Sequence, residues 1–416
     1  MTEVRAHHQT ALRVVAALAG NRHSPPDLLV RYAENARVEV RSAVAMNPGT
    51  PLTAMRRLVD DSDERVRAAV AHNAAASSDL LAGLVRSERG RPSARPARPW
   101  PGPRHIEAAV VQHPACPAAL LMEAAEDPDW QLRAAVARHP GCALATFARL
   151  ADDRSQEVVR GAAGNVACPS ELLDRLATRH AWNLRGAVLA NPRCPAELLE
   201  EAAGGERAYW NRVAVAENPS CPVGVLERLV GDPEWPVRVA VARHPMAPAM
   251  GLATLAADGM ADVAVAALSH PRCPPAVAAA ACDDREPLRY RAAAAHPRLP
   301  GAAVSRCARS ANAAVRAAVA GCVEARPNLL ARLADDPDPA VRAAVWWSPV
   351  CPPALLRHAA ATSDPATRGI IARHPRCPPA VATALAADPD PEVVVLVAAY
   401  TRSSAALRKL AATTVA

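Results

Sequence analysis

The chain has 416 residues, of which 51% are hydrophobic, 3% are aromatic and 40 are prolines. This composition excludes a disordered chain, and the shortage of aromatic residues argues against a β-sandwich or barrel. The net charge of +7 is not by itself a sign of nucleic-acid binding, because all but one of the 48 basic residues are arginine, a bias typical of high-GC codon usage, and the 41 acids are interspersed with them.

The sequence also predicts the compartment. No apolar run approaches the roughly 20 residues that a membrane-spanning helix needs, so we expect no membrane association. The 11 cysteines are an odd number, which fits poorly with a secreted disulfide framework. We therefore expect a reducing, cytoplasmic location.

A repeat governs nearly the whole chain. Fifteen positions, called anchors here, recur at a fixed spacing and are mostly Asn or His: Asn21, Asn47, Asn73, His113, His139, Asn165, Asn191, Asn218, His244, His270, His296, Cys322, Ser348, His374 and Tyr400. Of the 14 intervals between them, 12 are 26 residues long, one is 27 and one is 40. A period of this kind is the signature of a repeat architecture.

Each unit predicts two short helices. The first begins at a proline that follows the anchor, such as Pro195 or Pro352, because proline suits the first helical position. An Asp-Pro turn such as Asp336-Pro337 follows, and then a second helix with apolar residues at helical spacing. Such a pair cannot bury its apolar face alone, so the units must stack.

The predicted fold is therefore an all-α solenoid of about fourteen 26-residue, two-helix repeats that form a single domain over 1–416. Residues 1–20 match the second helix of a unit and are expected to be an N-terminal cap helix. The repeats occupy 21–399, and 400–416 form a C-terminal cap.

The 40-residue interval contains an insertion at 87–103, expected as a loop because its prolines forbid a helix. It carries Arg91, Arg95, Arg98 and Trp100, which we take as candidate binding residues. Insertions of a solenoid often lie on its binding face, although a surface loop without function is the plain alternative.

Aromatic residues cluster at one repeat position, nine residues before the anchor, in the middle of the chain. They are Trp130, Trp182, Tyr209 and Trp235, with Trp210 beside Tyr209. Other units have Pro or Gln there, so the position is expected to be partly exposed, and exposed aromatics in a row are typical binding anchors. The alternative is that they pack as core residues that hold the loops.

Two further regular patterns have structural and functional interpretations. Cysteine stands three residues after eight of the anchors, but a metal site needs about four convergent ligands, so we expect small core residues and no metal. Arginine precedes nine anchors by six residues, and an acid precedes nine by twelve. We expect a ladder of Arg–Asp pairs between turns; the alternative is a stripe of arginines on nucleic-acid phosphates.

The sequence gives little support for catalysis. No two glycines are two or four residues apart, which excludes both the dinucleotide-binding Gly-x-Gly-x-x-Gly and the Gly-x-Ser-x-Gly nucleophile elbow, and Lys409 stands outside any phosphate loop. We therefore expect no catalytic residues, no cofactor and no enzyme activity. An enzyme or lyase accessory with a site composed from several units is the weakest alternative.

The strings His374-Pro-Arg-Cys-Pro-Pro-Ala-Val and Leu333-Ala-Asp-Asp-Pro-Asp-Pro-Ala-Val-Arg-Ala-Ala-Val resemble the leucine-rich repeat variant (LRV) family and, more loosely, HEAT-like and armadillo-type repeats. The resemblance covers essentially the whole chain. It implies a right-handed, all-helical superhelix. The type member of the family has an N-terminal iron–sulfur cluster, which we do not transfer because the first cysteine here is Cys116.

These observations favour a non-enzymatic binding scaffold whose elongated surface holds a protein or peptide partner. The alternative is a nucleic-acid-binding, HEAT-like solenoid that uses arginine contacts to phosphates.

Overall fold

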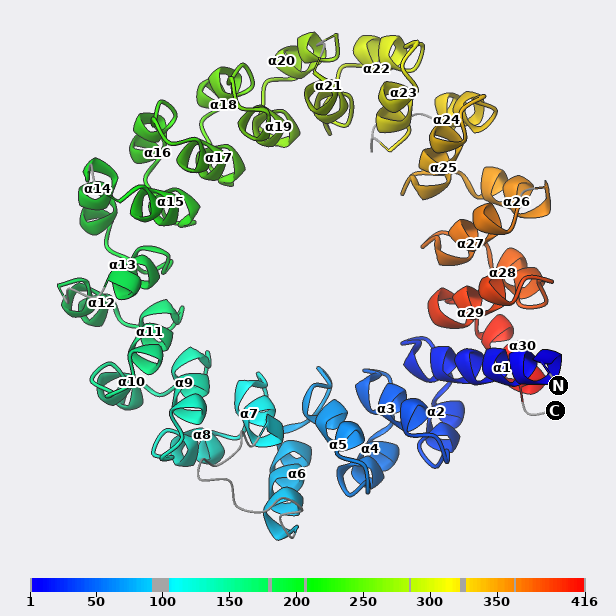
Figure 1. Cartoon of the computed structure of the whole chain (residues 1–416), viewed down its shortest axis with the longest axis horizontal. Helices are drawn as coiled ribbons and strands as arrows, with labels where there is room; N and C mark the ends of the chain where they lie inside the picture. Colours follow the sequence, from blue (N-terminus) through cyan, green and yellow to red (C-terminus); the bar gives the residue numbers. More distant parts are fainter. Residues whose placement is uncertain are drawn as a thin grey trace. The chain divides into compact units, whose positions relative to one another are not determined.

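The computed structural model of the chain describes residues 2–91, 105–178, 182–205, 208–283, 286–321, 327–362 and 364–414, with the backbone alone for 2–8, 182, 183 and 362. Within these ranges the chain forms 30 α-helices and no β-strand. Figure 1 shows a succession of short helix pairs, so the expected all-α solenoid fold is confirmed. None of the described helices is long and apolar enough to cross a bilayer.

The helices alternate between the two kinds that the repeat predicts. The first helices are α2 (Pro26–Tyr32), α4 (Leu52–Val59), α6 (Ser78–Gly90), α8 (Ala118–Ala124), α10 (Leu144–Leu150), α12 (Ser170–Ala177), α14 (Ala196–Gly204), α16 (Val223–Leu229), α18 (Ala249–Leu255), α20 (Pro275–Ala281), α22 (Gly301–Cys307), α24 (Pro327–Ala334), α26 (Pro353–Thr362), α28 (Pro379–Leu385) and α30 (Ser404–Thr413). The second helices are α1 (Thr2–Gly20), α3 (Val38–Met46), α5 (Glu64–Ala71), α7 (His105–Gln112), α9 (Trp130–Arg138), α11 (Gln156–Gly164), α13 (Trp182–Leu189), α15 (Tyr209–Glu217), α17 (Trp235–Arg243), α19 (Ala261–Ser269), α21 (Pro287–Ala294), α23 (Ala313–Ala320), α25 (Pro339–Trp347), α27 (Pro365–Arg373) and α29 (Pro391–Tyr400).

Proline and aspartate set where the helices start. The proline after the anchor lies one residue earlier than we expected: Pro195 is the N-cap of α14, with an extended ψ of 141°, and its carbonyl accepts the first helical hydrogen bond from Leu199. Several second helices begin after an aspartate whose side chain caps them. In α25, Asp338 accepts a hydrogen bond of 2.8 Å from the Ala340 amide. Such a bond satisfies an amide that the helix itself leaves unpaired.

The chain divides into two compact units. Unit 1 comprises Met1–Gly141 and Cys351–Ala416, and unit 2 comprises Cys142–Val350. The organisation of 1–416 as a single domain stays a prediction.

Both units are built as two layers of helices. The second helices of neighbouring repeats pack side by side, as α3 does with α5 in unit 1 and α15 with α17 in unit 2. The first helices form the other layer (Figure 1). The core between the layers is made of fully buried aliphatic side chains, such as Leu199 and Leu226 from first helices and Val215 and Val241 from second helices. Because each repeat buries its apolar face only against its neighbours, every internal interface contributes to the stability of its unit.

The two ends of the chain pack on each other within unit 1. Helix α1 lies against α29, as consecutive second helices do, and it also contacts the first helix α30. The Asn21 side chain donates hydrogen bonds of 2.8 Å to the Ala398 carbonyl and 3.0 Å to the Thr401 carbonyl. Arg13 pairs with Glu392 across the same contact. The segments expected to be two separate caps therefore combine, and α30 and α1 form one further repeat.

Candidate binding surface

The anchor side chains tie each repeat to the one before it. In unit 2, the Asn191 amide donates hydrogen bonds to the carbonyls of Ala163 (2.7 Å) and Asn165 (2.8 Å), and its oxygen accepts one from the Arg193 amide (2.8 Å). Histidine anchors make the equivalent bonds: His244 Nε2 lies 2.9 Å from the Asn218 carbonyl. Both side chains are buried, as are the other Asn and His anchors, whereas the anchor Tyr400 is 51% exposed.

The regularly placed arginines form the expected ladder of ion pairs, but with the next repeat. Arg212 in α15 binds both carboxylate oxygens of Asp232, at 2.6 and 3.0 Å, and Arg238 in α17 binds Asp258 at 2.6 and 3.1 Å. Arg41–Asp61, Arg316–Asp336 and Arg368–Asp388 repeat this geometry. Each pair joins residues 20 apart, whereas the acid and arginine of one repeat stand six apart.

Within one repeat the arginine contacts the backbone beside the acid. Arg238 Nη1 donates hydrogen bonds of 2.7 Å to the Asp232 carbonyl and 3.0 Å to the Pro233 carbonyl. The guanidinium is thereby fixed on two sides. In the Arg238–Asp258 pair, the hydrogen bond from Arg238 holds the pKa of Asp258 below its usual value. Arginines held in this way are not available as contacts for phosphates.

Seven of the eight cysteines after the anchors are buried core residues, and Cys377 is partly buried. Cys168, Cys273 and Cys351 are completely buried, and burial raises the pKa of Cys351 to about 11. No three His, Cys, Asp or Glu side chains gather into a metal-binding group in the described part of the chain. That the protein carries no metal stays a prediction.

The aromatic residues lie at the first turn of second helices. Trp130 begins α9 in unit 1, and Tyr209 and Trp235 begin α15 and α17 in unit 2, with Trp210 following Tyr209. Their exposed fractions are 37% for Trp130, 41% for Tyr209, 51% for Trp210 and 42% for Trp235. These values are high for large aromatic side chains. Trp182 begins α13, but its side chain lies outside the description.

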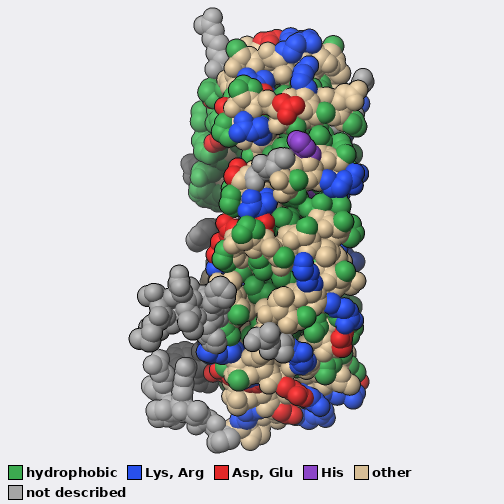
Figure 2. Space-filling model, turned by 90° about the vertical axis from the view of Figure 1, so that its right-hand side faces the viewer, with side chains coloured by type: hydrophobic (Ala, Val, Ile, Leu, Met, Phe, Trp, Pro, Cys, Tyr) green, Lys and Arg blue, Asp and Glu red, His purple; other side chains and the backbone are tan. Residues whose placement is uncertain are grey.

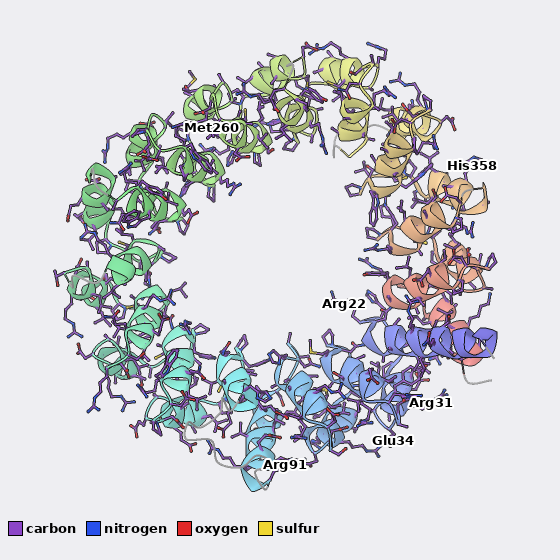
Figure 3. All side chains as sticks on the ribbon, viewed as in Figure 1. Arg22, Arg31, Glu34, Arg91, Met260 and His358 are labelled. Carbon is purple, nitrogen blue, oxygen red and sulfur yellow. The ribbon has the colours of Figure 1, made fainter. Side chains whose placement is uncertain are left out.

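Unit 2 places three of these rings on neighbouring helices. Helix α15 packs directly against α17, and α17 packs against α19. The rings of Tyr209 and Trp210 meet edge to face, with centroids 5.3 Å apart and planes at 69°. Met260, 42% exposed, stands just before α19 (Figure 3) and continues the surface into the next repeat. Tyr209, Trp210, Trp235 and Met260 are called the aromatic edge below.

Met260 was missed by the sequence analysis, together with two acids of the same edge. Glu234 is the N-cap of α17, Asp262 lies in the first turn of α19, and both are exposed. The signal was present, because these residues flank the repeat position that Trp235 occupies.

The insertion begins later than expected. Residues 87–90 extend α6, because the first proline of the segment is Pro92 and nothing before it interrupts the helix. Arg91, which precedes Pro92, is extended, with φ of −83° and ψ of 139°. Arg95, Arg98 and Trp100 lie outside the described residues.

Arg91 is engaged within the protein (Figure 3). Its guanidinium donates a hydrogen bond of 3.1 Å to the Asp60 carbonyl and lies 3.7 Å from a Glu88 carboxylate oxygen. Glu88 itself pairs with Arg67, so the first part of the insertion supplies the acid of the ladder in this repeat. The role of Arg91 is therefore at least partly structural.

Charges elsewhere on the surface are mixed. On the face that Figure 2 shows, basic and acidic side chains are interspersed and do not separate into one large patch of either sign. Surface ion pairs such as Arg175–Asp152 and Arg408–Asp27 contribute to this mixing. A surface of this kind gives little long-range attraction for a polyanion.

Comparison with known proteins gives one family match and several structural matches. Residues 210–234 match the family model of the leucine rich repeat variant, so the resemblance expected from the sequence is confirmed in that repeat. The structure is similar to that of Kap121p bound to Pho4p, with 13% identity and a TM-score of 0.24; the match covers 94% of this chain and 45% of that one. The chain thus spans less than half the length of that protein. No curated protein matches the sequence.

Proposed function

We propose that this helical-repeat protein, in which a leucine rich repeat variant is present, is a non-enzymatic scaffold that binds a protein or peptide partner in the cytoplasm. The observation that carries the proposal is the aromatic edge. It offers Tyr209, Trp210 and Trp235 to solvent on two helices in direct contact. Clustered, exposed aromatics are favoured as interface anchors because they bury a large area at a low cost in conformational entropy.

The charge distribution favours a protein partner over nucleic acid. A phosphate-binding stripe would need arginines that point freely into solvent, whereas Arg212 and Arg238 are held in bidentate ion pairs with side chains 8% and 17% exposed. Releasing such an arginine would leave a carboxylate without its partner. The cytoplasmic location rests on the odd number of cysteines and on the burial of those in the repeats.

Affinity capture with purified variants tests this proposal. Wild-type protein, the Trp210→Ala/Trp235→Ala double variant and the Trp347→Ala control are immobilised, and proteins captured from the native host are quantified. Trp347 is a suitable control because it is also an exposed tryptophan of unit 2, at the end of α25. We expect the wild type and Trp347→Ala to capture partners that the double variant does not capture. Each of the two tryptophans should contribute about 1 kcal/mol or more to the affinity.

The same capture distinguishes the alternative. Repeating it after nuclease treatment and over a series of salt concentrations reports whether a polyanion is involved. Binding that disappears with nuclease, or that falls by orders of magnitude as salt rises, would assign the protein to nucleic acid instead. Partners captured equally by the double variant would contradict the role of the aromatic edge.

A further inference from the structure

We propose that the aromatic edge binds an extended, arginine- and proline-containing segment of the partner. This inference rests on the proposed function and specifies the chemistry of the ligand. It follows from the surplus charge at the edge, from the exposed rings and from the spacing of the helices that carry them.

The edge carries a surplus of negative charge among its described residues. Arg212 and Arg238 neutralise Asp232 and Asp258 through bidentate ion pairs, and Arg289 adds one positive charge beside Asp258. Glu234 and Asp262 remain. Both are exposed, and no ion pair within the described part of the chain engages either of them. A ligand that covers the edge must therefore supply positive charge to avoid burying these carboxylates unpaired.

The rings favour the same kind of ligand. A guanidinium is attracted to the face of an indole, and its planar shape also stacks on an aromatic ring. Glu234 directly precedes Trp235 in the chain, so an arginine stacked on the indole has a carboxylate close by. Arginine can pair with a carboxylate through two parallel hydrogen bonds while it stacks, which a lysine cannot do.

The spacing of the repeats selects the backbone conformation of the ligand. The second helices α15, α17 and α19 pack side by side, at the roughly 8–10 Å that separates packed helices. A polyproline II segment rises about 3.1 Å per residue, so residues three apart are separated by about 9 Å. Arginines at positions i and i+3 of such a segment would therefore meet equivalent sites on consecutive repeats. Prolines between them fix this conformation before binding and reduce its entropic cost.

The chain itself provides a sequence of this kind as a probe. The segment 91–104 reads Arg-Pro-Ser-Ala-Arg-Pro-Ala-Arg-Pro-Trp-Pro-Gly-Pro-Arg, with Arg95 and Arg98 three residues apart. A synthetic, fluorescently labelled peptide of 91–104 is the test ligand. A peptide with all four arginines replaced by glutamine is its control. The full-length protein is used both as wild type and as the Arg95→Gln/Arg98→Gln variant, so that its own segment does not compete.

We expect the peptide to bind with micromolar affinity. Trp235→Ala should weaken binding about tenfold, because it removes a stacking surface. Glu234→Gln/Asp262→Asn should weaken it about threefold or more and flatten its salt dependence. Trp347→Ala should leave the affinity unchanged, and the glutamine peptide should not bind.

Three outcomes would overturn the inference. The first is equal binding of the arginine and glutamine peptides, and the second is unchanged binding by Trp235→Ala. The third is self-association of the wild-type protein that both Trp235→Ala and Arg95→Gln/Arg98→Gln abolish, which would make a second copy the occupant. Absence of peptide binding, combined with tryptophan-dependent capture of partners, would overturn this inference and leave the proposed scaffold function intact.

Discussion

At the scale of the residue, the anchor position shows how asparagine and histidine can be interchangeable. Asn191 accepts a hydrogen bond from a backbone amide two residues on and donates to a carbonyl 26 residues back. His296 does the same with its ring: Nδ1 accepts from the Arg298 amide, and Nε2 faces the His270 carbonyl. Because Nδ1 accepts a hydrogen bond from a backbone amide, Nδ1 itself carries no proton, and the ring is therefore neutral in the folded state.

Because histidine titrates and asparagine does not, the histidine anchors predict a pH dependence of stability that substitution by asparagine would remove. Burial lowers the pKa of His270 and of His296 in the folded protein. A group with a lowered folded pKa contributes its full stability above the unfolded pKa of about 6.5, and that stability is lost as the pH falls below it. We expect the wild type to lose stability in acid, by up to about 1.4 kcal/mol per pH unit for each proton taken up on unfolding.

The His270→Asn/His296→Asn variant should unfold at a similar urea concentration at neutral pH and lose less stability below pH ~6.5. Urea unfolding followed by circular dichroism across the acidic range measures this. Asn47→His is the reverse control, and it should add acid sensitivity to an asparagine anchor that is 1% exposed. Identical pH profiles for the wild type and the double variant would contradict the interpretation.

At the scale of the element, the arginine ladder joins each second helix to the turn of the following repeat. Arg212 and Asp232 are 8% and 5% exposed, so their charges are almost completely removed from water. Such a pair gives little net stability relative to apolar residues, but losing one partner is costly because the other charge stays buried alone.

We therefore expect Arg212→Ala to destabilise unit 2 by about 3 kcal/mol, and Arg212→Ala/Asp232→Ala to recover part of that loss. The matched control is Arg175→Ala, which removes a pair with Asp152 that is half exposed and also joins neighbouring repeats. It should cost no more than about 1 kcal/mol. Chemical unfolding of the wild type, Arg212→Ala, Asp232→Ala, the double variant and Arg175→Ala measures the differences. Additive effects of the two ladder substitutions would show that the pair is not coupled.

The helices were predictable from the sequence because their signals are local. Proline or aspartate marks where many of the helices begin, and residues such as Asp338 make their capping bonds within two residues. The partner of Arg212 was not predictable from the in-phase pairing of acid and arginine. Asp232 is 20 residues away, and the choice between it and the acid of the same repeat depends on how two repeats stack.

The candidate site was predictable only in part for the same reason. Aromatic residues at one repeat position pointed to Tyr209 and Trp235, and their exposure follows from that position at the first turn of a helix. The contribution of Met260 is harder to predict from the sequence, because it depends on which side chains of three neighbouring helices lie on the same edge. Residues 87–90 were expected in a loop because the segment that they begin is rich in proline. All of its prolines follow residue 90, however, and residues 87–90 complete α6.

At the scale of the whole molecule, the regular 26-residue period distributes stability over many similar interfaces. Proteins of this kind behave approximately as a sum of repeat and interface energies. A substitution such as Arg212→Ala is thus expected to act on its own repeat and its immediate neighbours. The aromatic edge can change with little effect on the fold, because its side chains contribute less to the core than Leu199 or Val215.

Helix α1 packs on α29 and α30, so the first and last described helices belong to one repeat. The repeat that α30 and α1 form is held together without a direct covalent link between the two helices, which lie against each other in Figure 1. A circular permutant with a flexible Gly-Ser linker from Ala416 to Met1, opened between Arg91 and His105, interrupts none of the described helices.

We expect this permutant to have the helical content of the wild type and at least its stability, since the linker prevents α1 from separating. A chain that lacks residues 1–20 should instead expose the apolar side of α29 and unfold at lower urea concentration or aggregate. Circular dichroism and size-exclusion chromatography of the two proteins would show this. If the permutant aggregates and the truncated chain stays stable, the packing of α1 on α29 and α30 does not stabilise the protein, and this prediction is wrong.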